Sequence, residues 1–336
     1  MTISLPESLG STRELLEPAL RTAIERLDPD TRRIAAYHFG LSDGDGNEGS
    51  LVGKAVRATL VLQSAQAAGA TPERGLPAAV AVELVHNFSL VHDDVMDGDE
   101  ERRHRATAWT AFDTSTAILA GDAMLTLAVE LLAEAEGSQA WALRCLSAAT
   151  RRLIAGQAAD LAFEQRDDVT MDECLAMARD KTAALLSCSA SVGAVLCSGP
   201  PGLVLGLAEY GDHLGLAFQL VDDLLGIWGD PTTTGKPVGA DLAARKKSLP
   251  VLAALTADHP AAGRLRQLYL GDEPLSEDEM LRAAELVEEA GGRAWAEAEA
   301  SRQLDSGLTR LEGLDLPDDV HRELSHIARF TTGRNH

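Results

Sequence analysis

Apolar side chains recur three and four residues apart from one end of the sequence to the other, and strict alternation of apolar and polar residues never lasts beyond a few positions. This spacing places the apolar residues on one face of an α-helix. Turn-rich clusters interrupt the pattern at 42–50, 69–77, 136–139, 199–202, 229–239 and 271–275. Several of the segments between them are roughly fifteen to thirty residues long, and we expect these to be helices.

Two sequence signals mark where helices start. Thr170 is followed by Glu173, and Ser276 by Glu279, in the pattern of a capping box. No low-complexity tract and no long internal repeat separates one part of the chain from another. The pattern therefore predicts a single all-α domain over residues 1–336.

Composition supports the helical interpretation and excludes some partners. Aromatic residues make up only 4% of the chain, which favours helices over a β-sandwich. The formal net charge is −22, and nucleic acids and anionic membranes are bound through an excess of lysine and arginine. We expect neither as a partner, and an anionic substrate would need a metal ion or local basic residues.

The cysteines and the hydropathy of the sequence indicate in which cellular compartment the protein is expected to lie. The four cysteines form no CxxC pair and no secretory signal precedes them, so we expect reduced thiols in a cytoplasmic protein. The most apolar window, 183–208, is long enough for a membrane span, but the sequence GPPG at 199–202 breaks it. Two core helices are the better interpretation.

The segment LVHDDVMDGDEERRHR at 90–105 concentrates six acidic residues ahead of a basic run. Asp93 and Asp97 lie one helical turn apart, with Asp94 beside them, and like charges at this spacing repel. Two such carboxylates suit Mg²⁺, which keeps several waters and takes its remaining ligands from substrate phosphates. The segment predicts a diphosphate ligand, the alternative being a solvated helix end.

A related segment, QLVDDLLG at 219–226, contributes Asp222 and Asp223. Two apolar helices that each end in paired aspartates suggest two walls of one cavity, with metal ions drawing negative charge off a leaving diphosphate. Basic candidates for phosphate contacts follow from the affinity of lysine and arginine for phosphate. They are Lys54, Arg57, Arg102, Arg103, Lys181, Lys236, Lys246 and Lys247. Taken singly, each of Lys181, Lys236, Lys246 and Lys247 is more typical of a surface lysine, and one of Arg102 and Arg103 could pair with Glu100 or Glu101.

Together these residues resemble the trans-isoprenyl diphosphate synthases, or polyprenyl synthetases. The resemblance covers about residues 50 to 255, and the helices of about 276–331 would brace that core. It is carried by DDxxD with RR at 93–103, the second aspartate pair, GKxxR at 53–57, His86, GQxxDL at 156–161, KT at 181–182, GKPVGADL at 235–242 and KKSLP at 246–250.

The resemblance implies an all-α helical bundle of the isoprenoid synthase type around a deep central cavity, commonly a homodimer. It implies condensation of isopentenyl diphosphate with an allylic diphosphate, with three Mg²⁺ ions. The implied metal residues are Asp93, Asp94, Asp97, Asp222 and Asp223. Those implied for the reacting groups are Lys181, Thr182, Gln219 and Lys236, and those for substrate binding are Gly53, Lys54, Arg57, His86, Phe88, Arg102, Arg103 and Lys246.

Several positions depart from the family pattern. The second motif ends in Gly226 where aspartate is usual, and Ala55 and Ala58 replace an arginine and a proline of the GKxxR segment. Ala106 replaces the proline that follows the paired arginines. These changes bear on substrate affinity and leave the reaction class standing.

Phe88 bears on product length. It lies five residues before Asp93, about 7 to 8 Å deeper along the helix at 1.5 Å per residue. In the family, a large residue here accompanies products of fifteen to twenty carbons, and the small Ser89 beside it favours geranylgeranyl over farnesyl diphosphate. Phe88 is equally compatible with an ordinary core position.

Three other functions are compatible with parts of the pattern. A class I terpene cyclase shares the metal chemistry but needs no site for isopentenyl diphosphate, against which the GKxxR segment and His86 argue. An HD-type phosphohydrolase with His86, His92, Asp93 and His104 as ligands leaves the second aspartate pair unexplained. A non-catalytic subunit of a hetero-oligomeric synthase would be expected to lose its aspartate motifs.

Overall fold

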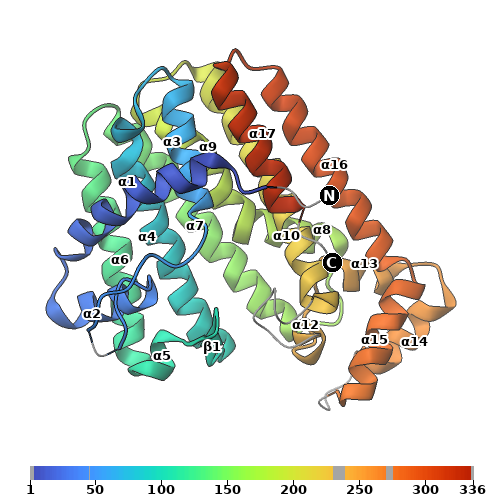
Figure 1. Cartoon of the computed structure of the whole chain (residues 1–336). Helices are drawn as coiled ribbons and strands as arrows, with labels where there is room; N and C mark the ends of the chain where they lie inside the picture. The colour runs from blue at the N-terminus through green and yellow to red at the C-terminus, as the bar shows by residue number, and fades with distance from the viewer. Residues whose placement is uncertain (1–3, 45, 230–238, 270–274, 334–336) are drawn as a thin grey trace. The chain divides into compact units, whose positions relative to one another are not determined.

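The computed structural model describes residues 4–44, 46–229, 239–269 and 275–333, and helices make up most of them (Figure 1). The helices in the first half of the chain are α1 (Glu7–Ile24), α2 (Pro29–His38), α3 (Val56–Ala67), α4 (Pro72–Asp97), α5 (Ala108–Ala111), α6 (Thr114–Glu134) and α7 (Gln139–Glu164). Those that follow are α8 (Met171–Ala178), the π-helix η1 (Arg179–Ala183), α9 (Ala184–Leu196), α10 (Pro201–Trp228), α12 (Ala240–Ala243), α13 (Leu249–Thr256), α14 (Pro260–Tyr269), α15 (Glu277–Glu289), α16 (Gly292–Glu312) and α17 (Asp318–Thr332). Two short strands, β1 (Glu101–Arg102) and β2 (Arg105–Ala106), form an antiparallel hairpin. The all-α expectation is confirmed.

The predicted helix boundaries have clear physical causes. Thr170 and Ser276 both form complete capping boxes, with Glu173 and Glu279 returning the hydrogen bond. The apolar window at 183–208 divides as predicted, because α9 ends at Leu196 and α10 begins at Pro201. All four cysteines are free thiols, and Cys174 and Cys188 are buried.

The chain comprises two compact units, and the first consists of Met1–Thr150, Leu185–Gly211 and Thr309–Phe330. Within it α4 packs against α3 and α6. Leu60, Leu84 and Met124, one from each of these helices, are fully buried. The helix that ends in the first aspartate motif is therefore anchored on two sides.

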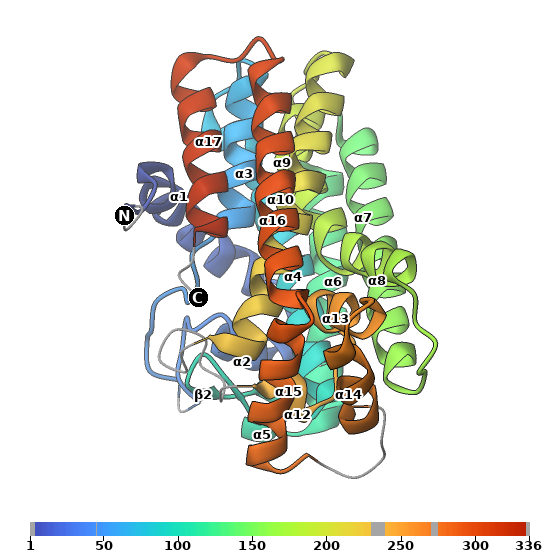
Figure 2. The same cartoon turned by 90° about the vertical axis from the view of Figure 1, so that its right-hand side faces the viewer.

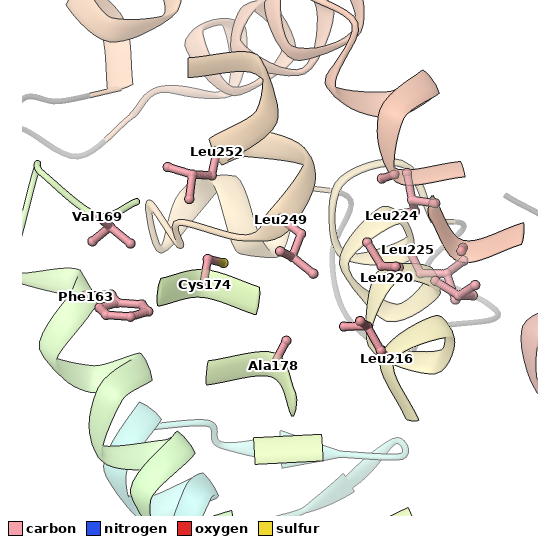
Figure 3. Close-up of a cluster of buried hydrophobic side chains, with 13 residues drawn as sticks. Phe163, Val169, Cys174, Ala178, Leu216, Leu220, Leu224, Leu225, Leu249 and Leu252 are labelled. Carbon is pink, nitrogen blue, oxygen red and sulfur yellow. The ribbon is translucent and has the colours of Figure 1, made fainter. Parts of the chain in front are cut away.

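The second unit consists of Arg151–Ala184, Asp212–Leu308 and Thr331–His336. One of its hydrophobic clusters joins Phe163 and Cys174 to Leu220 of α10 and Leu249 of α13 (Figure 3). A second cluster includes Ile227, Leu265 and Leu286, where α14 lies against α15 (Figure 2). Both clusters hold the end of α10 that carries the second aspartate pair. The single-domain expectation for residues 1–336 stays a prediction.

Helix α6 differs from the other helices in its surface. Within the described ranges it alone is long and apolar enough to cross a membrane, a criterion that core helices of soluble proteins also meet. Only 39% of its most apolar window is buried. Ile118, Leu119 and Val129 are 39%, 57% and 43% exposed, so α6 presents apolar side chains at the surface of the chain.

Candidate active site

The first aspartate motif occupies the last two turns of α4. Asp93 and Asp97 are partly buried, and Asp94 is only 1% exposed. Gly98, with φ of +69°, ends the helix directly after Asp97. The helix macrodipole is negative at this end, so the three carboxylates lie where cations are stabilised and anions are not. The location favours a bound cation.

Arg102 supplies part of the compensating positive charge. Its Nε and Nη2 atoms lie 2.7 and 2.6 Å from Oδ1 of Asp94. Burial raises the pKa of Asp94, while the hydrogen bond from Arg102 opposes the rise. The other oxygen, Oδ2, is buried without a hydrogen-bond partner. An unsatisfied carboxylate oxygen is a suitable acceptor for a metal-bound water or a hard cation, so the residues present fit Mg²⁺.

The paired arginines are held in the β1–β2 hairpin. Arg102 lies opposite Arg105, and the turn residues Arg103 and His104 have φ of +55° and +59°. Two consecutive positive φ values are the signature of a type I′ turn, which usually contains Asn or Gly. The turn directs Arg103 onto the GKxxR segment: a Cβ built on Gly53 would lie 3.2 Å from Nη1 of Arg103.

The predicted isopentenyl diphosphate residues of this unit lie close together. Nη1 of Arg57 is 3.1 Å from Nε2 of His86. Because arginine can only donate, His86 must accept and is therefore neutral. Burial, reinforced by the charge of Arg57, holds the pKa of His86 well below its usual value. Lys54 is exposed, with Nζ 4.7 Å from the ring centroid of Phe330 at the end of α17.

The three alanines that depart from the family pattern have the following backbone environments. Ala55 precedes α3 with φ of +50°, and the N–H of Ala58 donates to Oε1 of Glu83 at 3.1 Å. The carbonyl of Ala106 accepts from the hydroxyl of Tyr37 at 2.8 Å. The sequence interpretation did not single out Glu83, although an acid three residues before His86 in an apolar run was a visible signal.

In the second unit, Lys181 and Thr182 belong to the π-helix η1. Gly156 of α7 lies against it so closely that a Cβ would be 2.2 Å from the backbone nitrogen of Lys181. Nζ of Lys181 lies 2.6 Å from Oδ2 of Asp160. The GQxxDL segment thus supplies both the space for the π-helix and an anionic partner for Lys181. The sequence pattern indicates the GQxxDL motif but not the part that Asp160 plays in it.

A hydrogen-bonded chain links three of the predicted residues. The Thr182 hydroxyl donates to Oε1 of Gln219, whose Nε2 donates to Oδ1 of Asp223 at 2.7 Å. Oδ2 of Asp223 accepts from the N–H of Leu249 at 3.0 Å. Burial, with Asp241 as the next cause, raises the pKa of Asp223 to about 7. Both Asp223 oxygens are thus used within the protein, and Asp222 is the more exposed member of the pair.

The glycine that ends the second motif has a structural reason. A Cβ at Gly226 would lie 2.0 Å from Oδ2 of Asp241, so the carboxylate from the GKPVGADL segment occupies the space of a side chain at 226. Aspartate at this position would need α12 to shift. The departure from the family pattern is therefore matched by an acid that approaches from another element.

The remaining predicted residues lie as follows. Phe88 is 5% exposed and packs edge-on against His92, with ring centroids 5.1 Å apart. Nε2 of His92 lies 2.9 Å from the carbonyl of Ile118, so the ring faces α6. Lys246 is partly buried, and its backbone N–H donates to the carbonyl of Asp241. Lys236 lies outside the described residues.

The two aspartate motifs belong to different compact units of the chain. Among the described residues, no three His, Cys, Asp or Glu side chains converge as ligands of one metal ion. Protein sites for Mg²⁺ commonly supply one or two carboxylates, and waters and substrate phosphates complete the shell. The observed arrangement is compatible with ions that bind together with a diphosphate.

Comparison with known proteins shows a close likeness to one family. The family model described as polyprenyl synthetase matches residues 49–287. The (2E,6E)-farnesyl diphosphate synthase of Mycobacterium tuberculosis is 51% identical over 97% of this chain and 92% of its own length. The geranylgeranyl diphosphate synthase of the same organism is 41% identical, over 92% of this chain and 90% of its own length. The crystal structure of a polyprenyl synthetase from Streptomyces coelicolor A3(2) is similar with a TM-score of 0.92 and 48% identity, over 98% of this chain and 99% of that one.

Proposed function

Because the chain belongs to the polyprenyl synthetase family and is a short-chain trans-prenyltransferase, we propose that it condenses isopentenyl diphosphate with an allylic diphosphate to form geranylgeranyl diphosphate. The observation that carries the substrate assignment is the grouping of Gly53, Arg57, His86 and Arg103 in one unit. A terpene cyclase that acts on an allylic diphosphate alone would have no use for this second set of phosphate contacts.

In the proposed reaction the C–O bond of the allylic diphosphate breaks and diphosphate leaves. The double bond of isopentenyl diphosphate then attacks the allylic cation, and the departing diphosphate accepts the proton that is lost. Lys181, Lys236 and Arg102 would hold the allylic diphosphate. Lys54 joins the four grouped residues in binding isopentenyl diphosphate, with His86 as a neutral hydrogen-bonding group.

Thr182 and Gln219 would line the reacting carbons. Their mutual hydrogen bond, continued to Asp223, supports this role because it fixes the orientation of both polar groups. A neutral hydroxyl and an amide can face an allylic cation without forming a bond to it. Asp223 would then orient Gln219, and Lys246 would contact a substrate phosphate.

The family is magnesium-dependent, and we propose three Mg²⁺ ions held through Asp93, Asp97 and Asp222, with Asp94 and Asp223 beside them. Bound metal ions would neutralise the negative charge that develops on the leaving diphosphate. Asp94 supports the assignment because one of its oxygens is buried and unsatisfied.

Product length depends on Phe88. Phe88 lies five residues before Asp93 and is buried. Its position supports the proposal that its ring forms a wall that stops chain growth at fifteen to twenty carbons. The small neighbour Ser89 favours twenty carbons. Farnesyl diphosphate, with fifteen, is the second candidate, because the relative at 51% identity is a farnesyl diphosphate synthase.

The proposal is tested with purified protein, Mg²⁺, isopentenyl diphosphate and, separately, dimethylallyl, geranyl or farnesyl diphosphate. Matched reactions omit isopentenyl diphosphate. After dephosphorylation, mass spectrometry should find longer prenyl alcohols only where both substrates were present, with geranylgeraniol dominant. Farnesol as the end product would select the second candidate. A cyclic hydrocarbon from an allylic diphosphate alone would overturn the assignment.

The protein would act as a cytoplasmic homodimer. The free thiols are in keeping with a reducing compartment, and a second copy of the chain would cover the exposed apolar residues of α6.

A further inference from the structure

Glu83 is a buried acid that the proposed mechanism does not use. It lies in the apolar stretch VAVELV of α4 and is only 8% exposed. A glutamate is rarely buried to this degree unless it is paired. Burial raises the pKa of Glu83, while the charges of Arg57 and Arg103 act in the opposite direction. Its carboxylate therefore lies within electrostatic range of two proposed phosphate contacts.

The hydrogen bond of Glu83 serves the start of α3. Ala55, the residue before the helix, has no side chain that could cap it, and its φ of +50° is unfavourable for alanine. The N–H of Ala58 is one of the amides left without a partner inside the helix, and Glu83 accepts from it at 3.1 Å. A carboxylate from another helix thus takes the place of the usual capping side chain, at the end where anions are favoured.

The position of Arg57 follows from this contact. Arg57 lies in the first turn of α3, one residue before Ala58, and Nη1 of Arg57 is 3.1 Å from His86. His86 is itself three residues after Glu83, on the same face of α4. Glu83 therefore contacts the turn that carries Arg57 and lies on the helix face that carries His86.

Arg103 reaches the same place from the hairpin. Its guanidinium lies beside Gly53. Burial, together with the charge of Arg102, lowers the pKa of Arg103, and the charge of Glu83 opposes this shift. The charges of Arg57 and Arg103 both lower the pKa of His86, so both guanidinium groups act at the same side chain, and like charges repel each other. A buried negative charge behind them offsets that repulsion.

We propose that Glu83 is a positioning residue that holds Arg57 and Arg103 in the orientation that binds the diphosphate of isopentenyl diphosphate. The proposal rests on the proposed function, because it concerns the same substrate site. Glu83 does not touch substrate; it acts through the first turn of α3 and through its charge on the two arginines.

The substitution Glu83→Gln separates this role from simple capping. A glutamine keeps the size of the side chain and an oxygen that accepts from Ala58, but it carries no charge. Glu83→Ala removes both functions. Glu73→Gln, on an exposed acid in the first turn of α4, is the matched control.

Steady-state kinetics with isopentenyl diphosphate and geranyl diphosphate should show a selective defect. In E83Q we expect the KM for isopentenyl diphosphate to rise about tenfold, the size of effect that follows the loss of one interaction with a charged group. The kcat and the KM for geranyl diphosphate should stay within about twofold. E83A should show a larger rise together with a lower Tm, and E73Q should match the parent protein.

An unchanged or lower KM for isopentenyl diphosphate in E83Q would overturn the proposal and leave Glu83 as a helix cap. Calorimetric titration with isopentenyl diphosphate, without an allylic substrate, measures the same site apart from turnover. If the parent protein binds isopentenyl diphosphate but forms no product, the proposed function fails while the role of Glu83 is still tested by the affinity of E83Q.

Discussion

Gly156 and Lys181 lie in direct backbone contact, with room for no side chain at position 156. The contact places the π-helix η1 against α7, and Asp160, one turn after Gly156, pairs with the Lys181 ammonium group. A π-helix within an α-helical segment is uncommon and often marks a functional site. The glycine and the aspartate of one short motif thus fix both the backbone and the side chain of Lys181.

The variant Gly156→Ala should disrupt this contact. A methyl group 2.2 Å from the Lys181 nitrogen must push η1 away, at a cost of about 1–3 kcal/mol in stability. We expect a lower Tm. The shift of η1 would also displace Lys181 and Thr182, so kcat should fall by more than about tenfold, which corresponds to about 1.4 kcal/mol in the barrier. Gly10→Ala in α1 is the control: nothing lies within 4 Å of its Cβ, and it should stabilise the helix slightly. Equal behaviour of the two variants would contradict the argument.

Asp222 and Asp223 should respond differently to substitution by asparagine. Asp223→Asn places an NH₂ group against one of two donors, Gln219 or Leu249, so unfolding free energy should fall by about 1–3 kcal/mol. Asp222→Asn should leave Tm nearly unchanged and raise the Mg²⁺ concentration needed for half-maximal activity. A magnesium titration and a melting curve for each variant test whether Asp222 binds metal while Asp223 stabilises the fold. This assignment is wrong if D223N raises the Mg²⁺ requirement as strongly as D222N.

Truncation of Phe88 should lengthen the product. In Phe88→Ala the side chain that we propose limits chain growth is gone, so the product should exceed the length made by the parent protein by at least one isoprene unit. Phe39→Ala removes another buried ring of the same unit and should lower stability, by about 3–5 kcal/mol, without changing chain length. Mass spectrometry of the dephosphorylated products measures the chain length made by each variant. An unchanged product length in F88A would show that Phe88 is an ordinary core residue.

His38 predicts how stability depends on pH. Burial, with the charges of Arg102, Arg103 and Arg105, lowers its pKa from 6.5 to about 3, although a hydrogen bond with Asn87 opposes the shift. Below pH 6.5 the unfolded chain therefore takes up a proton that the folded protein does not. Between pH 6.5 and 3 this group should reduce stability as the pH falls, by up to about 1.4 kcal/mol per pH unit.

Denaturant unfolding of the parent protein and of His38→Gln across pH 4 to 8 isolates this contribution. The stability difference between the two proteins should be constant above about pH 7 and shift in favour of H38Q as the pH falls. Parallel curves over the whole range would show that His38 titrates normally.

The exposed face of α6 predicts the oligomeric state. Leu119→Glu places a charge in the proposed subunit contact and should convert a dimer to a monomer, as measured by light scattering after size-exclusion chromatography. Leu205→Glu, on a leucine that is 64% exposed in α10, is the matched control and should remain dimeric. A monomeric parent protein would leave the face of α6 without this role.

Sequence patterns predicted those features that depend on local spacing. Thr170 and Ser276 cap helices because each has a glutamate three residues later, and the acids of 93–97 share a helix end because they lie within one turn. Features that depend on packing between distant segments were not predictable. The sequence gives no sign that Glu83 caps α3, or that the two oxygens of Asp223 are satisfied by Gln219 and Leu249.

The same limit applies to the departures from the family pattern. Gly226 read as the loss of an acid, but the structure shows that Asp241 fills the space. From the sequence, Ala55 and Ala106 are expected to affect substrate affinity; the structure shows a left-handed backbone at Ala55 and a hydrogen bond from Tyr37 to the carbonyl of Ala106. Of these departures, Gly226 is explained by a partner that lies far away along the chain.

The hairpin turn carries a conformational cost at Arg103 and His104. Arg103 and His104 both adopt a backbone conformation that costs a residue with a side chain about 1–2 kcal/mol relative to the right-handed one. Glycine or asparagine at either position would relax the turn. If Arg103 binds substrate as proposed, losing its guanidinium harms function more than the strained turn costs stability, so variation in natural relatives should be freer at His104 than at Arg103.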